Sequence, residues 1–246
     1  MSPGLLVTLR ITHYNKNTGS LKDMSALDPT QTLVELTMAI CDIESVSSNE
    51  AKLADEIEQI LTTASHLSIT RDGNAIVART NLNRDTRVII AGHIDTVPVA
   101  ENLPTRLHHF EREQVIFGRG TVDMKGGIAV MLKLAVEIQQ PKFDVTWIFY
   151  DNEEVAADLN GLGRLASNHP ELLTGEFAIL CEPTSAMIEG GCNGTVRVEV
   201  RTVGIKAHSA RPWMGKNAIH ALAHSLNILN DYQPATVTVD GLDYKE

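Results

Sequence analysis

The sequence has few cysteines and no obvious export signal. It contains three cysteines, Cys41, Cys181 and Cys192, and no CxxC pair. An odd number of unpaired cysteines is more typical of a reducing compartment than of a disulfide framework. The apolar piece at residues 4–9 is too short for a signal peptide and has no basic residues ahead of it. We therefore expect a cytoplasmic protein.

Basic residues are outnumbered, and long apolar runs are missing. Lys and Arg total 21 while Asp and Glu total 31, so the formal net charge is −10. A negative protein is a poor partner for nucleic-acid backbones and anionic membrane surfaces. The longest apolar candidate, residues 128–138, is broken by Lys133 and is shorter than the roughly 18–20 residues that cross a bilayer. We expect neither nucleic acid nor a membrane as partner.

Three common catalytic motifs are also absent. The sequence has no GxSxG, no HExxH and no GxxxxGK followed by Ser or Thr. Their absence removes the simplest serine-hydrolase, zincin and P-loop interpretations. Gly118-Arg119-Gly120 begins like a dinucleotide fingerprint, but Asp123 stands where the third glycine belongs, so an ordinary turn is favoured there.

What the sequence does contain is an alternation of helical stretches and short β-branched runs. Hydrophobic residues make up 43%, as in an ordinary globular chain. Apolar spacing predicts helices within 30–41, 53–61, 125–139 and 162–168. Strand-like runs lie at 74–78, 88–91, 115–117, 145–150 and 177–180. This order predicts an α/β domain with a largely parallel or mixed sheet.

The pattern changes after Gly190-Gly191. Val196, Val198 and Val200 alternate with charged residues, which predicts a half-buried strand over 196–201. A helix over about 217–229 and a weak strand at 236–239 follow. We predict three parts: an N-terminal tail (1–23), a catalytic domain (24–193) and a smaller domain (194–246).

The candidate functional residues follow the ends of predicted strands, where ligands collect in α/β sheets. They are His93, Asp95, Asp123, Glu153, Glu154 and Glu182. His93 and Asp95 project to the same side of an extended chain, so the carboxylate can accept one ring N–H and leave the other ring nitrogen for a cation. For His93 alone, an ordinary hydrogen-bonded histidine at a strand end stays open as the alternative.

The remaining acids have structural alternatives of their own. Asp123 could cap the following helix, although Gly126-Gly127 favour a backbone that passes close to a metal pair. If extended, Glu153 and Glu154 point in opposite directions, so one could bind a metal and the other act as a base. A solvated loop is the alternative for this pair, and a surface turn for Glu182. Three ligand carboxylates carry −3 against the +4 of two Zn²⁺, which suits a dinuclear hydrolase.

Four segments together resemble the dizinc aminoacylase and carboxypeptidase family. They are GHIDTVP at 92–98, GRGTVDMKGG at 118–127, NEEV at 152–155 and EPT at 182–184. The resemblance runs from about Ala26 to the last residue. It implies a mixed-sheet, zinc-peptidase-like catalytic domain with a smaller α+β, ferredoxin-like lid domain that usually forms a homodimer.

Within that family, residues 160–163 and 204–212 resemble the branch that acts on an N-acyl amino acid of lysine biosynthesis. That branch hydrolyses N-succinyl-LL-2,6-diaminopimelate to succinate and LL-2,6-diaminopimelate. The same site in sister enzymes serves an acetylornithine deacetylase, a dipeptidase or an aminoacylase. Nothing in the residues above identifies the acyl group, so these substrates stay open as alternatives.

The resemblance also implies a ligand set for two zinc ions per full-length subunit. His93, Asp123 and Glu182 would hold one zinc, and Asp123 would bridge to a second zinc held by Glu154. Carboxylate-rich sites also accept Co²⁺ or Mn²⁺. The resemblance further implies a cis peptide bond after Asp123.

Three residues are implied to act on the substrate or on a ligand. Glu153 would be the general base, and Asp95 the partner of the His93 ring. His208, in the lid, would reach the partner subunit's site and stabilise the oxyanion. Without the resemblance, a lid-surface histidine is an equal alternative for His208.

The chain departs from the family pattern in one place. Members carry a final histidine ligand of the second zinc in a C-terminal segment, and this chain stops inside the lid before reaching it. His220 and His224 do not fit that role, because both lie on the predicted lid helix. We therefore expect either a fragment or an incomplete site. An inactive, truncated metal-binding product is the alternative of a different class.

Overall fold

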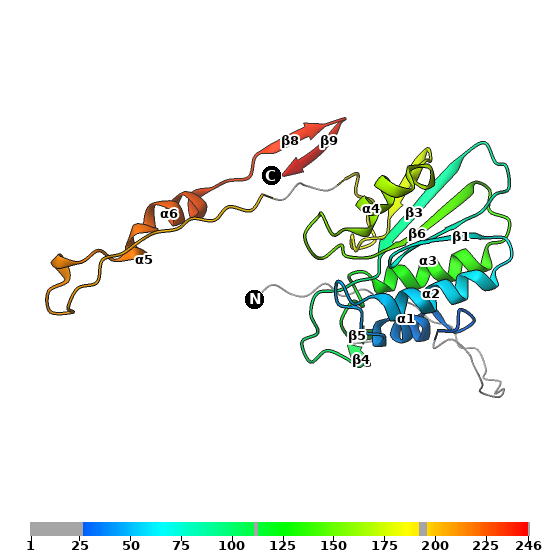
Figure 1. Cartoon of the computed structure of the whole chain (residues 1–246), viewed down its shortest axis with the longest axis horizontal. Helices are drawn as coiled ribbons and strands as arrows, with labels where there is room; N and C mark the ends of the chain where they lie inside the picture. Colours follow the sequence, from blue (N-terminus) through cyan, green and yellow to red (C-terminus); the bar gives the residue numbers. More distant parts are fainter. Residues whose placement is uncertain (1–26, 111–112, 192–195, 246) are drawn as a thin grey trace. The chain divides into compact units, whose positions relative to one another are not determined.

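The computed structural model describes residues 27–110, 113–191 and 196–245. The chain divides into two units, with the border between Ala186 and Met187. The predicted tail at 1–23 and the predicted domain border at 193/194 lie outside the described residues. Figure 1 shows the sheet and its helices in the first unit, and short helices and a hairpin in the second.

A five-stranded mixed sheet forms the centre of the first unit. Its strand order is β1-β2-β6-β3-β7. The strands are β1 (Ser68–Asp72), β2 (Ala75–Arg79), β6 (Asp144–Tyr150), β3 (Arg87–His93) and β7 (Phe177–Leu180). β3 runs parallel to β6 and β7, while β2 runs antiparallel to β6 and to β1. The predicted mixed α/β architecture is confirmed.

Helices cover both faces of this sheet (Figure 1). The helices α1 (Leu33–Asp42), α2 (Ala51–Thr63) and α3 (Lys125–Glu137) pack on one face, while α4 (Gly161–Asn168) and the 3-10 helix η1 (Pro170–Leu173) lie on the other. A capping box between Thr32 and Glu35 begins α1. Within the described ranges, no helix is both long and apolar enough to span a membrane.

Strand β6 shows why the chain folds this way. All of its residues are buried. Val145, Trp147 and Phe149 join the core under α1–α3, whereas Ile148 and Tyr150 join the core under α4. A strand buried on both faces is specified by a continuous apolar run. The register that results places the polar residues after Tyr150 at the edge of the sheet where β3 and β7 also end.

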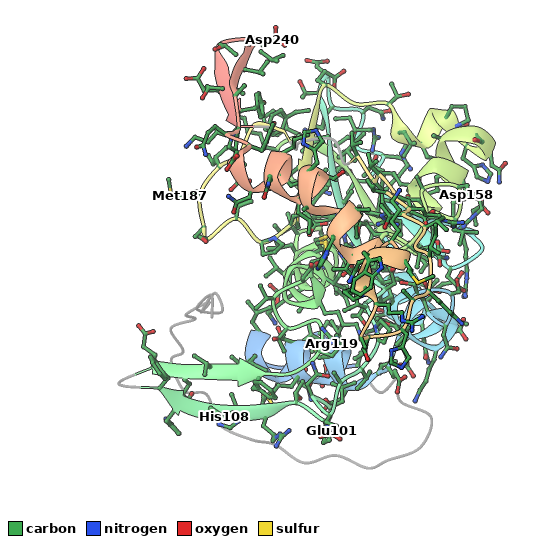
Figure 2. All side chains as sticks on the ribbon, turned by 90° about the vertical axis from the view of Figure 1, so that its left-hand side faces the viewer. Glu101, His108, Arg119, Asp158, Met187 and Asp240 are labelled. Atoms are coloured by element: carbon green, nitrogen blue, oxygen red, sulfur yellow. The ribbon has the colours of Figure 1, made fainter. Side chains whose placement is uncertain are left out.

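A separate hairpin consists of β4 (Arg106–Phe110) and β5 (Glu113–Phe117). The two strands pair antiparallel, with Arg106 opposite Phe117. The Arg106 guanidinium lies 5.5 Å from the centre of the Phe117 ring, and His108 packs edge-on against that ring. Figure 2 shows His108 on this hairpin and Arg119 at its base.

The second unit has little regular structure. It contains η2 (Pro212–Met214), α5 (Ala218–Ala221), α6 (Ala223–Asp231), β8 (Thr236–Val239) and β9 (Leu242–Lys245). The predicted strand at 236–239 is confirmed as β8, paired with β9. The predicted helix at 217–229 is present as two helices, with Leu222 between them.

The predicted half-buried strand over 196–201 is wrong. These residues have no strand structure, and Val196, Val198 and Val200 are 87%, 75% and 52% exposed. A strand needs a neighbour for its backbone groups and a core for its apolar side. Among the described residues of this unit, no strand pairs with 196–201 and no residue is buried. The alternating pattern therefore has nothing within the unit to bury it.

Candidate metal centre

The carboxyl ends of three parallel strands bring most of the predicted site residues to one edge of the sheet. His93 is the last residue of β3, Glu153 and Glu154 follow β6, and Glu182 follows β7. Asp123 lies in the loop between β5 and α3. Parallel strands that end at one edge of a sheet present their following residues to the same place.

His93, Asp123 and Glu182 form a compact cluster. The His93 Nε2 atom lies 3.0 Å from Asp123 Oδ1 and 3.6 Å from Glu182 Oε1. One ligand atom from each residue lies within 4.8 Å of the others. The imidazole is buried, at 1% exposure, while the Asp123 and Glu182 side chains are 54% and 36% exposed. A fixed imidazole and two open carboxylates suit a cation that enters from solvent.

The buried carboxylate of Asp95 lies behind the His93 ring. The Nδ1 atom of His93 is 3.0 Å from the Asp95 carbonyl oxygen and 3.3 Å from Asp95 Oδ1. Nδ1 thus faces two acceptors, so its hydrogen points to Asp95 while Nε2 faces Asp123 and Glu182. The contact expected from the sequence is present, although the backbone oxygen is the nearer acceptor.

Asp95 also holds the backbone of the acidic pair. The amide of Glu153 donates to Asp95 Oδ1 at 3.0 Å, and the amide of Glu154 donates to Asp95 Oδ2 at 3.1 Å. Successive amides of an extended chain point in opposite directions. Because both amides point to one carboxylate, the backbone turns sharply at this pair, so the extended case considered from the sequence does not apply to it. Glu153 is exposed, and Glu154 is half-buried.

A second buried carboxylate, Glu50, holds the same turn from its other side. Fully buried at the start of α2, it accepts the amide N–H of Asn152 at 3.3 Å and that of Ser48 at 2.7 Å. Ser48 and Asn152 have φ of 70° and 58°, and the Ser48 hydroxyl donates to the Asn152 side-chain oxygen at 2.8 Å. Two buried carboxylates therefore hold three successive amides, 152–154.

Ser47 and Glu50 are not among the site residues predicted from the sequence. The Ser47 hydroxyl donates to Asp95 Oδ2 at 2.7 Å. Both residues belong to the polar run SSNE at 47–50, which is typical of a helix start. This run is the sequence feature that could have drawn attention to Ser47 and Glu50. It does not indicate their partners, because Asp95 lies 48 positions after Ser47 and Asn152 lies 102 positions after Glu50.

The charges in this cluster favour a bound cation. Burial lowers the pKa of His93, but hydrogen bonds with Asp123 and Asp95 outweigh it and raise that pKa to about 10. Burial raises the pKa of Glu154 and of Glu182, and repulsion from Asp123 raises both further. Several carboxylates thus crowd around one imidazole. A divalent cation bound among them would relieve this repulsion, so the residues present fit a metal.

The pKa of Asp95 shifts in the opposite direction. Burial alone would raise it, but hydrogen bonds from His93, from the amides that follow β6 and from Ser47 lower it below its usual range. Asp95 therefore stays ionised at neutral pH. A buried carboxylate that remains ionised is a steady acceptor for the imidazole N–H.

The loop before α3 shows that Asp123 does not cap that helix. The cap position is Met124, and no side chain makes a capping hydrogen bond there. The Asp123–Met124 peptide bond is cis, as the resemblance implied. Gly127 lies so close to the end of β7 that a side-chain carbon there would be 2.7 Å from the Cys181 carbonyl oxygen. The glycine thus allows the start of α3 to pass beside the cluster.

The remaining histidines of interest belong to the second unit. His208 is exposed, and its Nδ1 accepts the amide of Ala210 at 3.1 Å. His220 lies on α5 and His224 on α6. Among the described residues, the cluster of possible metal ligands contains none of these three.

The motifs of this site match a known family. Residues 89–240 match the sequence model of Peptidase family M20/M25/M40. The chain belongs to this family. The match includes every residue of the cluster and continues into the second unit.

Two bacterial relatives within this family are similar over most of the chain. A Mycobacterium tuberculosis protein named as a succinyl-diaminopimelate desuccinylase is 50% identical over 214 residues, covering 87% of this chain and 59% of that protein. The succinyl-diaminopimelate desuccinylase of Corynebacterium glutamicum is 44% identical over 218 residues, covering 87% and 58%. The chain thus spans less than two thirds of the length of these relatives.

Two solved structures of peptidases share the fold. A tripeptidase from Staphylococcus aureus superposes with a TM-score of 0.58 at 16% identity, over 87% of this chain and 63% of that one. The aminopeptidase PepT from Bacillus cereus gives a TM-score of 0.52 at 14% identity, over 88% and 64%. At this identity the likeness concerns the fold.

Proposed function

We propose that the whole protein is a metal-dependent amide hydrolase. The observation that carries this proposal is the cluster of His93, Asp123 and Glu182, whose ligand atoms lie within 4.8 Å of one another at the carboxyl edge of the sheet. Membership of the M20/M25/M40 peptidase family supports hydrolysis of an amide bond.

The substrate proposed is N-succinyl-LL-2,6-diaminopimelate, which the enzyme would hydrolyse to succinate and LL-2,6-diaminopimelate. The names of the relatives at 44% and 50% identity support this choice over other acyl amino acids. The net charge of −10 supports a small-molecule substrate rather than a nucleic acid. This reaction would serve lysine and cell-wall precursor synthesis in the cytoplasm.

The proposed ligand assignment combines the three-residue cluster with Glu154, which the family resemblance adds. His93, Asp123 and Glu182 would hold one zinc ion, and Asp123 and Glu154 a second, with Co²⁺ or Mn²⁺ as alternatives. When bound, such ions polarise the scissile carbonyl and lower the pKa of a bound water. Asp95 would keep the His93 ring in the tautomer and orientation that leave Nε2 for the metal.

Glu153 is proposed as the general base. Its side chain is exposed, while its backbone is fixed through the hydrogen bond to Asp95. An exposed carboxylate on a fixed turn can take the proton of the attacking water and then deliver it to the leaving amine. Glu154 follows directly in the chain, so ligand and base would share one rigid turn.

The second unit is proposed as a lid through which two chains form a homodimer. His208 would then donate a hydrogen bond to the developing oxyanion in the partner's site. The resemblance of residues 204–212 supports this role, and the exposed His208 side chain is compatible with it.

The test is a comparison of two amides with the whole gene product. Zinc-loaded enzyme is assayed for succinate released from N-succinyl-LL-2,6-diaminopimelate and for acetate released from N-acetylornithine. Faster succinate release, lost after chelation and restored by zinc, is expected. Faster acetate release would favour the acetylornithine substrate instead. If metal-loaded enzyme cleaved neither amide, the proposed function would be wrong.

A further inference from the structure

A cavity of about 310 Å³ lies beside the metal cluster. Its lining residues are Thr96, Val97, the loop residues 118–123 and Glu154. The cavity therefore reaches two proposed metal ligands, Asp123 and Glu154. Arg119 is the one basic residue among its lining residues. Among the described lining residues, Arg119 is thus the one that offers a ligand in this cavity a positive charge.

The Arg119 side chain has no partner among the described residues. Its Nε atom is buried and makes no hydrogen bond, and no ion pair joins its guanidinium to a described carboxylate. By contrast, Arg71 pairs with Asp55 and Glu58, each at 2.7 Å. A half-buried arginine at a cavity that is not paired with a carboxylate of the protein can bind the carboxylate of a ligand, often through two parallel hydrogen bonds.

The surrounding loop fixes the backbone of Arg119. The Arg119 amide donates to the Asn102 carbonyl at 3.0 Å. Gly118 packs so closely on Thr105 that a side-chain carbon there would lie 2.6 Å from the threonine methyl. Gly120 has a φ of +77°, a conformation that glycine adopts without strain. The glycines on both sides of Arg119 pack closely on neighbouring residues, so the backbone position of Arg119 is fixed.

We propose that Arg119 binds the free carboxylate of the substrate's acyl group. This inference rests on the proposed function, because it places the amide carbonyl at the metals. A succinyl group carries its carboxylate two methylenes beyond that carbonyl. Within a single cavity, the carbonyl can therefore reach the metals while the carboxylate reaches Arg119. The acids that line the cavity would repel a second carboxylate, and Arg119 supplies the compensating charge. Arg119 would therefore favour dicarboxylic acyl groups over acetyl.

The test measures binding of succinate and butyrate to the zinc-loaded chain by calorimetry. The two probes have the same carbon chain length, and only succinate has a second carboxylate. We expect succinate to bind more tightly. Arg119→Gln should weaken succinate binding about 10- to 100-fold, the loss expected for a charge-assisted hydrogen-bond pair, and leave butyrate binding unchanged. Arg119→Lys should restore part of the affinity.

The matched control is Arg79→Gln. The Arg79 Nε is also buried without a hydrogen bond, but Arg79 does not line the cavity. This variant should bind succinate like the unmodified chain. Zinc content and circular dichroism of each variant separate a local loss from misfolding. The comparison of probes on the unmodified chain needs no variant and tests the proposal even if Arg119→Gln fails to fold.

Two results would overturn the assignment of Arg119 while leaving the proposed function intact. One is zinc-loaded protein that binds succinate and butyrate equally. The other is Arg119→Gln that keeps its zinc and its full succinate affinity. A chain that binds no zinc at all would instead contradict the proposed function, and with it the carboxylate subsite.

Discussion

The three-residue cluster and the acidic pair are fixed in different ways. In the cluster, the buried ring of His93 meets Asp123 and Glu182 directly. In the pair, the side chains of Glu153 and Glu154 extend from a turn whose amides are held by Asp95. One half of the site is thus organised by side-chain contacts and the other by its backbone.

This difference indicates a division of labour. A metal needs ligand atoms that already converge, whereas a base needs a carboxylate free to exchange protons with water. Asp95 connects the two halves, because the same carboxylate faces the His93 ring and accepts the amides of the turn. Substitutions in the two halves should therefore have separable effects.

The largest effect is expected at the proposed base. In the whole enzyme, Glu153→Ala should lower kcat by about 10²–10⁴, the range of general acid–base catalysis, with metal content unchanged. Steady-state kinetics and elemental analysis on the same preparation measure both quantities. Glu171→Ala, an exposed glutamate in η1 outside the cluster, is the control and should turn over normally. Normal turnover of Glu153→Ala would remove Glu153 from the mechanism.

The next effect separates the two metal positions. Glu182→Ala should weaken the tighter metal by more than about 100-fold, since a direct ligand matters more than its hydrogen-bonding partners. Glu154→Ala should leave this metal in place and weaken only the second. Zinc titrations of the whole enzyme with a competing chelator measure the affinities of both metal positions. Equal loss in the two variants would mean that cluster and pair form one indivisible site.

Zinc binding should depend on pH through His93. Its pKa of about 10 means that the ring is protonated at pH 7 in the metal-free chain and must lose a proton to bind zinc. Affinity of the tighter site should therefore rise about tenfold per pH unit between pH 6 and 8. Calorimetry in buffers of different ionisation enthalpy gives the proton count, expected near one. No proton release would contradict the arrangement around His93.

The smallest effect is expected at Glu50, behind the turn. Glu50→Gln leaves one oxygen for the Ser48 and Asn152 amides but turns an NH2 group toward the Asn74 side-chain amide, which now donates to the second carboxylate oxygen, so the turn should loosen. The second metal should weaken by about tenfold, as for other residues that orient a ligand, with the first unaffected. Glu58→Gln, on the same helix but paired with Arg71, is the control. A parallel loss of both metals would indicate general destabilisation instead.

Local patterns predicted the elements that have a core to contact. β6 was predicted because burial on both faces leaves an apolar run, and α1 because its apolar spacing is helical. β1 and β4 were missed, since SITRD and RLHHF carry too many polar residues for such a run. The strand over 196–201 was predicted from a pattern that no described neighbour buries.

The candidate site shows the same limit. Position at the end of a strand singled out His93 and Glu182 as candidates, because parallel strands bring their ends together. Asp123 follows the separate hairpin, and its place in the ligand set came from the family resemblance. The turn at Glu153 could not be predicted, since its amides are held by a carboxylate 58 positions away. Contacts between residues so far apart in the sequence depend on tertiary packing, and the spacing of residues within a short segment does not predict them.

The most direct test of the central claim is the number of zinc ions that the 246-residue chain retains after dialysis. Under the proposed assignment, described residues would supply three ligands to one position and two to the other, and catalytic zinc normally has three protein ligands. We therefore predict about one tightly held zinc per chain by elemental analysis, and none in His93→Ala. No retained zinc, two tightly held zincs, or equal retention by His93→Ala would contradict the proposed centre.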